Sequence, residues 1–320
     1  ALEALELDWA FALDHLDKSF PGYRHCPILS YISSRGCPHA CVFCSATLGK
    51  RFRRVSAGKI VADLQAIRKL ASRRFAASEK FIIAFGDDNF LHDRKRAGEF
   101  FDMVAEQELD QFFQFTFQAS INCFFRDLKN AEPDLGLLDL IKRANVRFLT
   151  FGTDAFSDVE LKRLRKAGYT TRHIAALVQA LEERQLLNNH FCILSNLRTS
   201  AEDMLDTLTR IRDLDRRHKY FIQLRPIMYM APYYGTPAWR EIAEQPDLRQ
   251  GNVEPCHFLF PPAGGVFLAK KILPLDPRAR HALEALDQDV ETKLVKGIPY
   301  SYDLEAALAV VSRYLEEPLA

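Results

Sequence analysis

Three cysteines lie within eight residues near the start of the chain, at Cys37, Cys41 and Cys44. Their C-x3-C-x2-C spacing arises rarely by chance in a chain that has only seven cysteines. Soft thiolates in one short loop bind zinc or an iron–sulfur cluster. A structural zinc site usually takes four protein ligands as two separated pairs, and no second Cys/His pair follows at such a spacing. The triad therefore favours a [4Fe-4S] cluster with one iron open to a non-protein ligand, and zinc is the alternative.

Acidic and basic residues stand after several apolar runs of the sequence. They are Asp87 and Asp88, then Asp154, and then the basic pair Arg165 and Lys166. Each has an ordinary structural alternative. An Asp after a strand is common in a solvated turn or at a helix N-cap, and a basic pair is usually an exposed helix face. These residues are candidates for a site, and their place in the fold decides between the two interpretations.

Apolar, strand-like runs alternate along the chain with segments of 3.6-residue periodicity, which are typical of amphipathic helices. Strands separated by helices form a parallel sheet, because parallel neighbours need a crossover connection. We therefore predict an α/β fold, a partial (βα)6 TIM-like barrel. In such barrels the chemistry gathers at the carboxyl ends of the strands, where the acidic and basic candidates stand. The six predicted strands cover residues 28–33, 80–85, 112–119, 147–151, 190–195 and 220–228.

The predicted barrel occupies the middle of the chain. Residues 1–27 are expected to form a lead-in or linker, and residues 28–240 the barrel. Beyond about residue 240 the alternation stops, and two helical patterns follow at 278–296 and 303–316. We predict that residues 241–320 form a C-terminal helical extension that caps the barrel or docks a partner. The chain lacks an initiating Met, so we expect it to be part of a longer protein.

The composition excludes several classes of protein. The chain has 43 Lys and Arg against 42 Asp and Glu, so a nucleic-acid or membrane-surface partner is not expected from charge. The basic run at 50–54 follows the cysteine loop. It could bind an anionic substrate or RNA, it could contact a reductase, or it could be a solvated loop. The sequence contains no run of 18 apolar residues, so we predict no membrane span. The first residues do not have the pattern of a signal peptide. An odd number of cysteines indicates a reducing compartment, and we expect a cytoplasmic protein.

The triad resembles that of the radical S-adenosylmethionine (SAM) superfamily, because an aromatic residue, Phe43, precedes its last cysteine at the mouth of a first strand. The resemblance covers about residues 28–240. It implies two cofactors, a [4Fe-4S] cluster and SAM, whose amino and carboxylate groups chelate the open iron. It also implies reductive cleavage of SAM to a 5′-deoxyadenosyl radical, which abstracts hydrogen from a small-molecule or peptide substrate. An electron donor such as flavodoxin or ferredoxin would be a partner.

Within the superfamily, four parts of the chain are most similar to the cobalamin-binding subgroup. They are residues 27–38, 85–90, 152–155 followed by 161–166, and 232–237. This likeness implies cobalamin as a third cofactor and a cobalamin-binding domain before the barrel. The implied reactions are methylation of unactivated carbons or radical rearrangement. A methylthiotransferase-like enzyme would need three more cysteines upstream. The pattern is also compatible with a cobalamin-independent radical SAM enzyme, or with an electron-transfer module without catalysis.

The resemblance also implies which residues bind the cofactors. Cys37, Cys41 and Cys44 would hold the cluster. Asp87 or Asp88 would contact the SAM amino group. Asp154, which stands where the subgroup commonly has Glu, would hold the ribose. Arg165 or Lys166 would pair with the SAM carboxylate. No catalytic side chain is identified, and the complete set of expected SAM-binding residues is Phe43, Gly86, Asp87, Asp88, Ser120, Asp154, Arg165, Lys166 and Tyr229.

Overall fold

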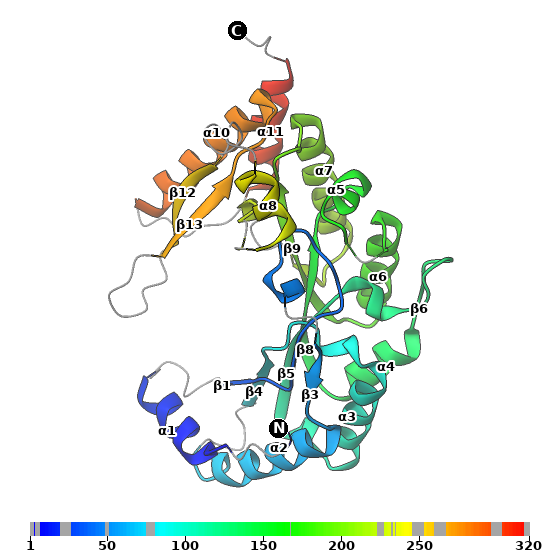
Figure 1. Ribbon diagram of the computed structural model, residues 1–320. Coiled ribbons are helices and arrows are strands. Elements are labelled where there is room, and N and C mark those ends of the chain that lie inside the picture. Colours follow the sequence, from blue (N-terminus) through cyan, green and yellow to red (C-terminus); the bar gives the residue numbers. More distant parts are fainter. Residues whose placement is uncertain are drawn as a thin grey trace. The chain divides into compact units, whose positions relative to one another are not determined.

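A computed structural model describes most of the chain (Figure 1), and every structural statement below concerns the residues that it describes. These are residues 3, 7–19, 27–48, 51–74, 81–166, 168–222, 227–231, 233, 235–244, 253–258, 267–295 and 303–316. They belong to two compact units. The first comprises Ala1–Pro38, Gly49–Gly152 and Ala176–Asn189, and the second comprises His39–Leu48, Thr153–Ala175 and His190–Ala320.

The first unit is built on parallel strands whose side chains alternate between two environments. In β5 (Phe113–Ala119), every second residue is buried, beginning with Phe113, and the residues between are only partly buried. Successive side chains of a strand point to opposite faces of the sheet, so the buried apolar residues share the face that packs against the helices. The strands are β1 (Ile28–Tyr31), β4 (Phe81–Phe85), β5 (Phe113–Ala119) and β8 (Val146–Asp154), and each pairs in parallel with the next.

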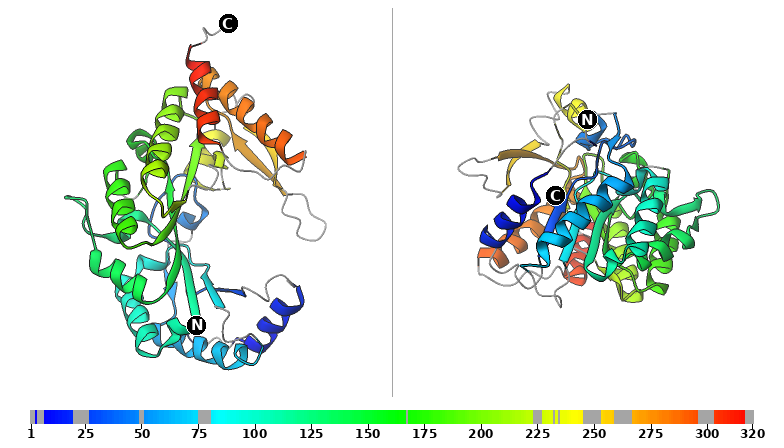
Figure 2. Two further views of the ribbon diagram at one scale, coloured as in Figure 1. Left: turned by 180° about the vertical axis from the view of Figure 1, so that it is seen from behind. Right: turned by 90° about the horizontal axis from the view of Figure 1, so that it is seen from below.

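Helices cover one face of these strands. Figures 1 and 2 show α1 (Trp9–Ser19), α2 (Ala57–Ala71), α3 (Arg94–Glu106) and α4 (Leu135–Arg143) side by side in that order. Ser56, Asp93 and Asp134 cap α2, α3 and α4 by accepting backbone N–H bonds. Between helices and strands lies a core of phenylalanines, and each fully buried ring contributes about 1.5–3 kcal/mol. Its fully buried members include Phe81, Phe90, Phe100, Phe101, Phe113 and Phe115.

The complete sheet has the order β1-β4-β5-β8-β9-β10, and β11 also pairs with β9. The later strands are β9 (Leu187–Ser195), β10 (Phe221–Ile222) and β11 (Ile227–Tyr229). All six predicted strand regions therefore contain strand. The last is divided into β10 and β11, and residues 223–226 between them lie outside the described residues. Strands β8 and β9 are longer than predicted, since their polar ends extend the apolar runs.

The second unit contains the chain after residue 190. A buried cluster joins α7 (Ala201–Arg217) to the two last helices through Met204, Leu208, Leu283 and Val311. The helical patterns at 278–296 and 303–316 are thereby confirmed. The antiparallel hairpin of β12 and β13 was not predicted. The elements are α5 (Asp158–Arg163), α6 (Thr171–Glu183, shared between the units), α7 (Ala201–Arg217), α8 (Pro237–Ala243), β12 (Val253–Phe258), β13 (Phe267–Ile272), α10 (Pro277–Val295) and α11 (Leu304–Glu316).

Shorter elements complete the description. Helix α1 lies in the predicted lead-in, and its Trp9 stacks on Tyr31 with ring centroids 5.7 Å apart. None of the described helices is long and apolar enough to cross a membrane. The predicted boundaries at residues 27 and 240 stay predictions. The small strands are β2 (Ser34–Arg35), β3 (Arg53–Arg54), β6 (Phe125–Asp127) and β7 (Glu132–Pro133), and the 3-10 turns are η2 (Ser45–Leu48), η3 (Phe90–His92), η4 (Leu109–Gln111) and η5 (Ile121–Phe124).

Candidate functional site

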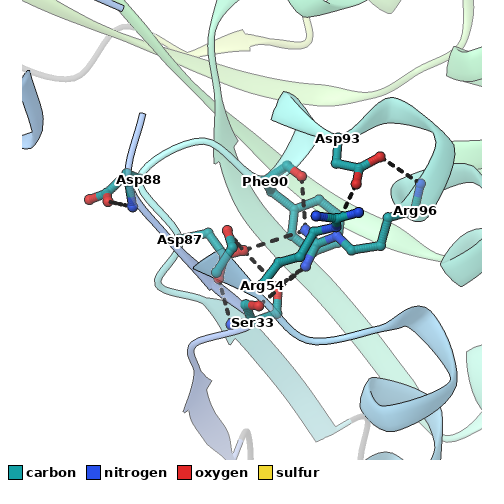
Figure 3. A network of polar contacts seen from close by, with 9 residues as sticks. Ser33, Arg54, Asp87, Asp88, Phe90, Asp93 and Arg96 are labelled. Atoms are coloured by element: carbon teal, nitrogen blue, oxygen red, sulfur yellow. Dashed lines mark hydrogen bonds and ion pairs between the residues drawn. The ribbon is translucent and has the colours of Figure 1, made fainter. Parts of the chain in front are cut away.

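Asp87, at the carboxyl end of β4, organises the chain that leaves β1 toward the cysteines (Figure 3). Its Oδ1 accepts the Ser33 N–H at 2.7 Å, and its Oδ2 accepts the hydroxyls of Ser33 and Ser34, each at 2.6 Å. The carboxylate is completely buried. Charge-assisted bonds of this kind are short and strong. In this structure Asp87 thus fixes the exit of β1, and its contact with the SAM amino group stays a prediction.

Arg96 of α3 supplies the positive charge that Asp87 needs in this buried place. Its Nη2 lies 3.6 Å from Asp87 Oδ2, and its Nη1 donates to Ser33 Oγ at 3.0 Å. The guanidinium also donates to the Phe90 carbonyl at 3.1 Å. Burial lowers the pKa of Arg96, and the Asp87 carboxylate opposes that effect. The pair is a buried ion pair whose remaining hydrogen-bonding groups are largely satisfied, as such pairs require.

Asp88 holds the residue immediately before the first cysteine. Its Oδ2 accepts the backbone N–H of Gly36 at 2.8 Å. Gly36 has a φ of 100°, and a Cβ placed there would lie 2.8 Å from the Arg51 carbonyl oxygen. Only glycine fits both the left-handed backbone and the close approach. The two acidic residues after β4 therefore position the segment that leads into Cys37.

Replacing Gly36 with alanine should destabilise the protein by about 1–3 kcal/mol, because the new methyl group forces the Arg51 backbone to move. Urea denaturation measures the loss. The matched control is Gly58→Ala in α2, where the added Cβ meets no heavy atom within 4 Å apart from its chain neighbours and the backbone of its own helix. That control should be neutral or stabilising. Equal stability of the two variants would contradict the role given to Gly36.

The loop that carries Cys41 and Cys44 is anchored within the second unit. The Val42 N–H donates to the Leu164 carbonyl at 3.2 Å, and the Val42 carbonyl accepts the Ala238 N–H at 3.0 Å. Cys41 is buried, whereas Cys44 is partly exposed. Burial raises the pKa of the Cys41 thiol, and the Lys166 ammonium beside it acts in the opposite direction. The loop is thus held from both sides with a cation next to one thiol.

Lys166 forms a buried ion pair with Asp154 Oδ2. Its ammonium also lies 5.9 Å from the centroid of the Phe43 ring, which favours a cation–π contact. Burial opposes the charge on Lys166, but the Asp154 carboxylate, acting together with Tyr169 and Cys41, raises the Lys166 pKa above its usual value. Asp154 has a φ of 63°, a left-handed conformation that Asp tolerates better than most residues. The structure therefore brings together Phe43, Cys41, Asp154 and Lys166.

Two further residues fix the end of β8 next to Asp154. The Tyr169 hydroxyl donates to the Thr153 carbonyl at 2.9 Å. The Thr153 hydroxyl lies 2.7 Å from His190 Nδ1 in β9. Burial lowers the pKa of His190 to about 3, so the ring is neutral at physiological pH. These contacts hold the backbone that presents the Asp154 carboxylate.

A second buried network ties α5 to the end of β9. Glu160 accepts hydrogen bonds from Arg163 and from Asn196, and Arg163 also pairs with Asp203. Burial raises the pKa of Glu160, and Arg163 opposes that shift. Asp203 in turn forms a capping box with Ser200 at the start of α7. The network fixes the turn after β9 relative to α5.

A cavity of about 500 Å³ lies within the second unit, bounded by these same elements. Three arginines line it. Arg163 and Arg198 are ion-paired, Arg198 with Glu241 at 2.6 Å. Arg165 is exposed, has a φ of 52°, and forms no ion pair in the described part of the chain. Further residues of the wall are Val42, Leu164, Leu197, Met230 and Ala238.

The remaining candidates occupy separate places. The Gly86 N–H donates to the Tyr31 carbonyl at 2.8 Å, which extends the pairing of β1 with β4. The Ser120 hydroxyl, after β5, is buried and has no hydrogen-bond partner among the described residues. Tyr229 lies in β11 opposite Ser195 of β9. Cys37 belongs to the first unit, while Cys41 and Cys44 belong to the second.

The donor chemistry of the three cysteines fits an iron–sulfur cluster. All three are free thiols, and Cys37 and Cys44 are partly exposed. Thiolates are the ligands that such clusters take. Within the described ranges, no three His, Cys, Asp or Glu side chains are gathered closely enough to hold a metal ion. The interpretation of the triad as cluster ligands thus depends on its spacing and on the family to which the chain belongs.

A sequence model of the radical SAM superfamily matches residues 31–222, which is more than half of the chain. The chain belongs to the radical SAM superfamily. Members of this superfamily use a [4Fe-4S] cluster and SAM, so both predicted cofactors are supported. The match begins within β1 and ends with β10, and it includes all three cysteines of the triad.

Two solved structures with a similar fold contain cobalamin. OxsB, determined with aqua-cobalamin and SAM bound, superposes with a TM-score of 0.69 at 16% identity, over 88% of this chain and 43% of that one. The methyltransferase TsrM from Kitasatospora setae, with cobalamin and a [4Fe-4S] cluster, gives a TM-score of 0.62 at 15% identity, over 84% and 54%. At these identities the likeness shows the fold alone. It confirms the predicted α/β fold of the partial TIM-barrel class with C-terminal helices.

One curated relative matches a shorter part of the sequence. The uncharacterized methyltransferase PH0819 of Pyrococcus horikoshii is 30% identical over 125 residues, which are 38% of this chain and 25% of that protein. The chain therefore spans a quarter of the length of this relative. It also spans about half or less of the two solved structures.

Several residues of the site were not found from the sequence. Arg96, Tyr169, Glu160 and Asn196 all lie in buried polar contacts beside the candidates. Arg96 and Glu160 look like ordinary charged positions of amphipathic helices. The sequence offered one usable signal: Tyr169 follows the basic pair in the same loop and could have been grouped with it.

Proposed function

We propose that this chain reductively cleaves SAM and uses the resulting radical to abstract hydrogen from its substrate, with Cys37, Cys41 and Cys44 as the cluster ligands. When bound, the cluster and SAM supply the electron and the 5′-deoxyadenosyl radical. The observation that carries the proposal is the grouping of Cys41, Phe43, Asp154 and Lys166 in the unit whose cavity is lined by the exposed Arg165. That arrangement suits a ligand with a carboxylate and a ribose.

The cavity of the second unit is our proposed site for SAM. Its volume of about 500 Å³ lies in the range of about 300–1,000 Å³ that small-molecule sites occupy. Leu164, Leu197 and Met230 offer apolar surface to an adenine ring. Asp154 is not among the residues that line the cavity, but it is paired with Lys166, which directly follows Arg165 of the cavity wall. Its Oδ2 is occupied by Lys166, so Oδ1 is the oxygen that would accept a ribose hydroxyl. The ion pair thus holds the carboxylate in place for this bond.

Arg165 is the better of the two basic candidates for the SAM carboxylate. The Lys166 side chain is buried and already paired with Asp154, whereas Arg165 is exposed at the cavity. A planar guanidinium also matches a carboxylate with two parallel hydrogen bonds. We therefore assign the carboxylate to Arg165, and Lys166 to holding Asp154 and the cysteine loop.

Arg165→Gln should weaken SAM binding about tenfold or more, because a hydrogen bond between charged groups contributes about 1.5–3 kcal/mol. Isothermal titration of the reconstituted protein with SAM measures the dissociation constant. Lys162→Gln is the matched control, since it removes one positive charge from the exposed face of α5. An unchanged affinity in Arg165→Gln would show that another group binds the carboxylate.

We further propose that the complete protein is a cobalamin-associated methyltransferase or rearrangement enzyme. The support is the likeness of its cluster-loop flanks to that subgroup, together with the names of the structures and of the relative that it resembles. A reductase such as flavodoxin or ferredoxin would supply electrons, and a reducing, cytoplasmic setting would preserve the thiols.

Cobalamin binding tests this finer proposal. The 320-residue chain alone should leave the corrin absorbance of added hydroxocobalamin unchanged. The product of the complete gene should shift that absorbance and should transfer a methyl group when a substrate is supplied. If the complete product also ignores cobalamin, a cobalamin-independent radical SAM enzyme becomes the better account.

A further inference from the structure

One face of the first unit's sheet carries a group of polar side chains that the proposed chemistry does not use. In β5, Phe113, Phe115 and Phe117 are buried toward the helices. Gln114, Thr116 and Gln118 alternate with them and are only partly buried. Because successive side chains of a strand point to opposite faces, these three share the face opposite α2, α3 and α4 (Figure 1).

The strand register extends this polar row to β8 and places an aliphatic row beside it. Gln118 pairs with Thr150 of β8, and Thr116 pairs with Phe148. On the other side, Gln114 pairs with Ile82 of β4. Ile82 in turn pairs with the exposed Ile28 of β1. Neighbouring strands lie about 4.8 Å apart, so amides, hydroxyls and aliphatic groups form one continuous surface.

The polar groups on this face are not used by the described part of the protein itself. Among the described residues, the side chains of Gln114, Thr116, Gln118 and Thr150 form no hydrogen bond, although most of their neighbours on the helix side are completely buried. An amide offers two donors and two acceptor positions, and a hydroxyl offers one donor and two acceptor positions. Four such groups in adjacent register positions are suited to a ligand that supplies matching donors and acceptors.

Little charge lies on the same surface. On β8 the charged positions are Arg147, at the irregularity that interrupts the pairing with β5, and the terminal Asp154, whose carboxylate is paired with Lys166. The other residues of β1, β4, β5 and β8 on this face are uncharged. The ionised groups of the unit's site, Asp87 and Arg96, lie on the helix side or at the strand ends and pair with each other. A carboxylate or an ammonium placed here would lose hydration without a compensating partner.

We propose that this face seats the substrate, and that the part of the substrate in contact with it is a neutral group that combines an amide or hydroxyl with an aliphatic edge. Gln114, Thr116, Gln118 and Thr150 bond the polar part, and Ile28 and Ile82 contact the aliphatic edge. The inference rests on the proposed function, because β1 leads into the segment before Cys37 and the residues after β4, Asp87 and Asp88, hold that segment. It adds the substrate class, which no comparison supplies.

A matched pair of probes tests the substrate class. N-acetyl-leucinamide is neutral, and N-acetyl-leucine has nearly the same shape but carries a carboxylate at neutral pH. Saturation-transfer NMR titrations of the reconstituted protein give both affinities without any reductant. The neutral probe should bind at least about tenfold more tightly than the anion. Gln118→Leu and Thr116→Val should each weaken binding of the neutral probe about three- to tenfold, which is the effect of one lost hydrogen bond.

The control is Gln179→Leu on the exposed side of α6, which should leave the affinity for the neutral probe unchanged. Thermal unfolding of each variant shows whether its fold is intact. Valine has nearly the same shape as threonine, so Thr116→Val still tests the inference if Gln118→Leu does not fold. Three results would each overturn the inference. The anion could bind as tightly as the neutral probe or more tightly, the neutral probe could fail to bind, or Thr116→Val could leave its affinity unchanged. Formation of 5′-deoxyadenosine by the wild type is measured separately, so failure of the proposed function is distinguishable from failure of this inference.

Discussion

Changing Cys37, Cys41 or Cys44 singly to alanine should abolish cluster binding. The wild type, reconstituted anaerobically, should hold about four irons per chain, as a [4Fe-4S] cluster requires. Each variant should retain almost none, because two thiolates cannot hold a cube that already leaves one iron without a protein ligand. Iron and sulfide analysis, with the visible absorbance of the cluster, measures the loss.

Two further free cysteines of the chain provide matched controls. Cys123 donates weakly to Asn89 in the first unit, and Cys192 is buried in β9, where burial raises the pKa of its thiol. Alanine at either position should leave the iron content unchanged. Cys26 and Cys256, whose side chains lie outside the described residues, are also expected not to matter. One zinc per chain and no iron after anaerobic isolation would contradict the prediction.

Lys166→Met should lower the free energy of unfolding by about 3–5 kcal/mol, because it leaves the Asp154 carboxylate buried without its partner. The Phe43 contact and the cation beside Cys41 are lost at the same time. Since the Lys166 pKa is raised above that of an unfolded lysine, the pair's contribution is fully present at neutral pH and is lost only at higher pH. Urea denaturation at neutral pH therefore measures it completely.

A double-mutant cycle separates the pair from its surroundings. Lys166→Met combined with Asp154→Asn should be less destabilised than the sum of the single changes, since no unpaired charge remains. Lys162→Met, on the exposed face of α5, is the control and should change stability by less than about 0.5 kcal/mol. Additive single effects would show that Lys166 and Asp154 do not depend on each other.

The strands could be predicted because their signals are local. The phenylalanine alternation of β5 and the apolar run of β4 are visible within a few residues. The cysteine triad is likewise a local motif. The hairpin of β12 and β13 was missed because its sequence lacks a clean alternation and the segment between its strands is rich in Pro and Gly. Patterns of that kind resemble an irregular linker.

Partners distant in sequence could not be predicted. Asp87 was selected from its place after a strand, but its bonds to Ser33 span 54 residues and depend on the pairing of β1 with β4. Lys166 and Arg165 are adjacent and look alike in the sequence. Only the backbone turn, which buries one side chain and exposes the other, distinguishes their roles. Side-chain partners thus follow from tertiary packing, whereas the elements follow from local pattern.

The most direct test of the account is whether the reduced protein forms 5′-deoxyadenosine from SAM. The wild type, reconstituted with iron and sulfide and treated with dithionite, should form it slowly without any added substrate, and liquid chromatography with mass spectrometry detects it. Formation should disappear in Cys41→Ala and persist in Cys192→Ala. A wild-type protein that holds a complete [4Fe-4S] cluster and binds SAM, yet forms no 5′-deoxyadenosine under reduction, would contradict the central claim.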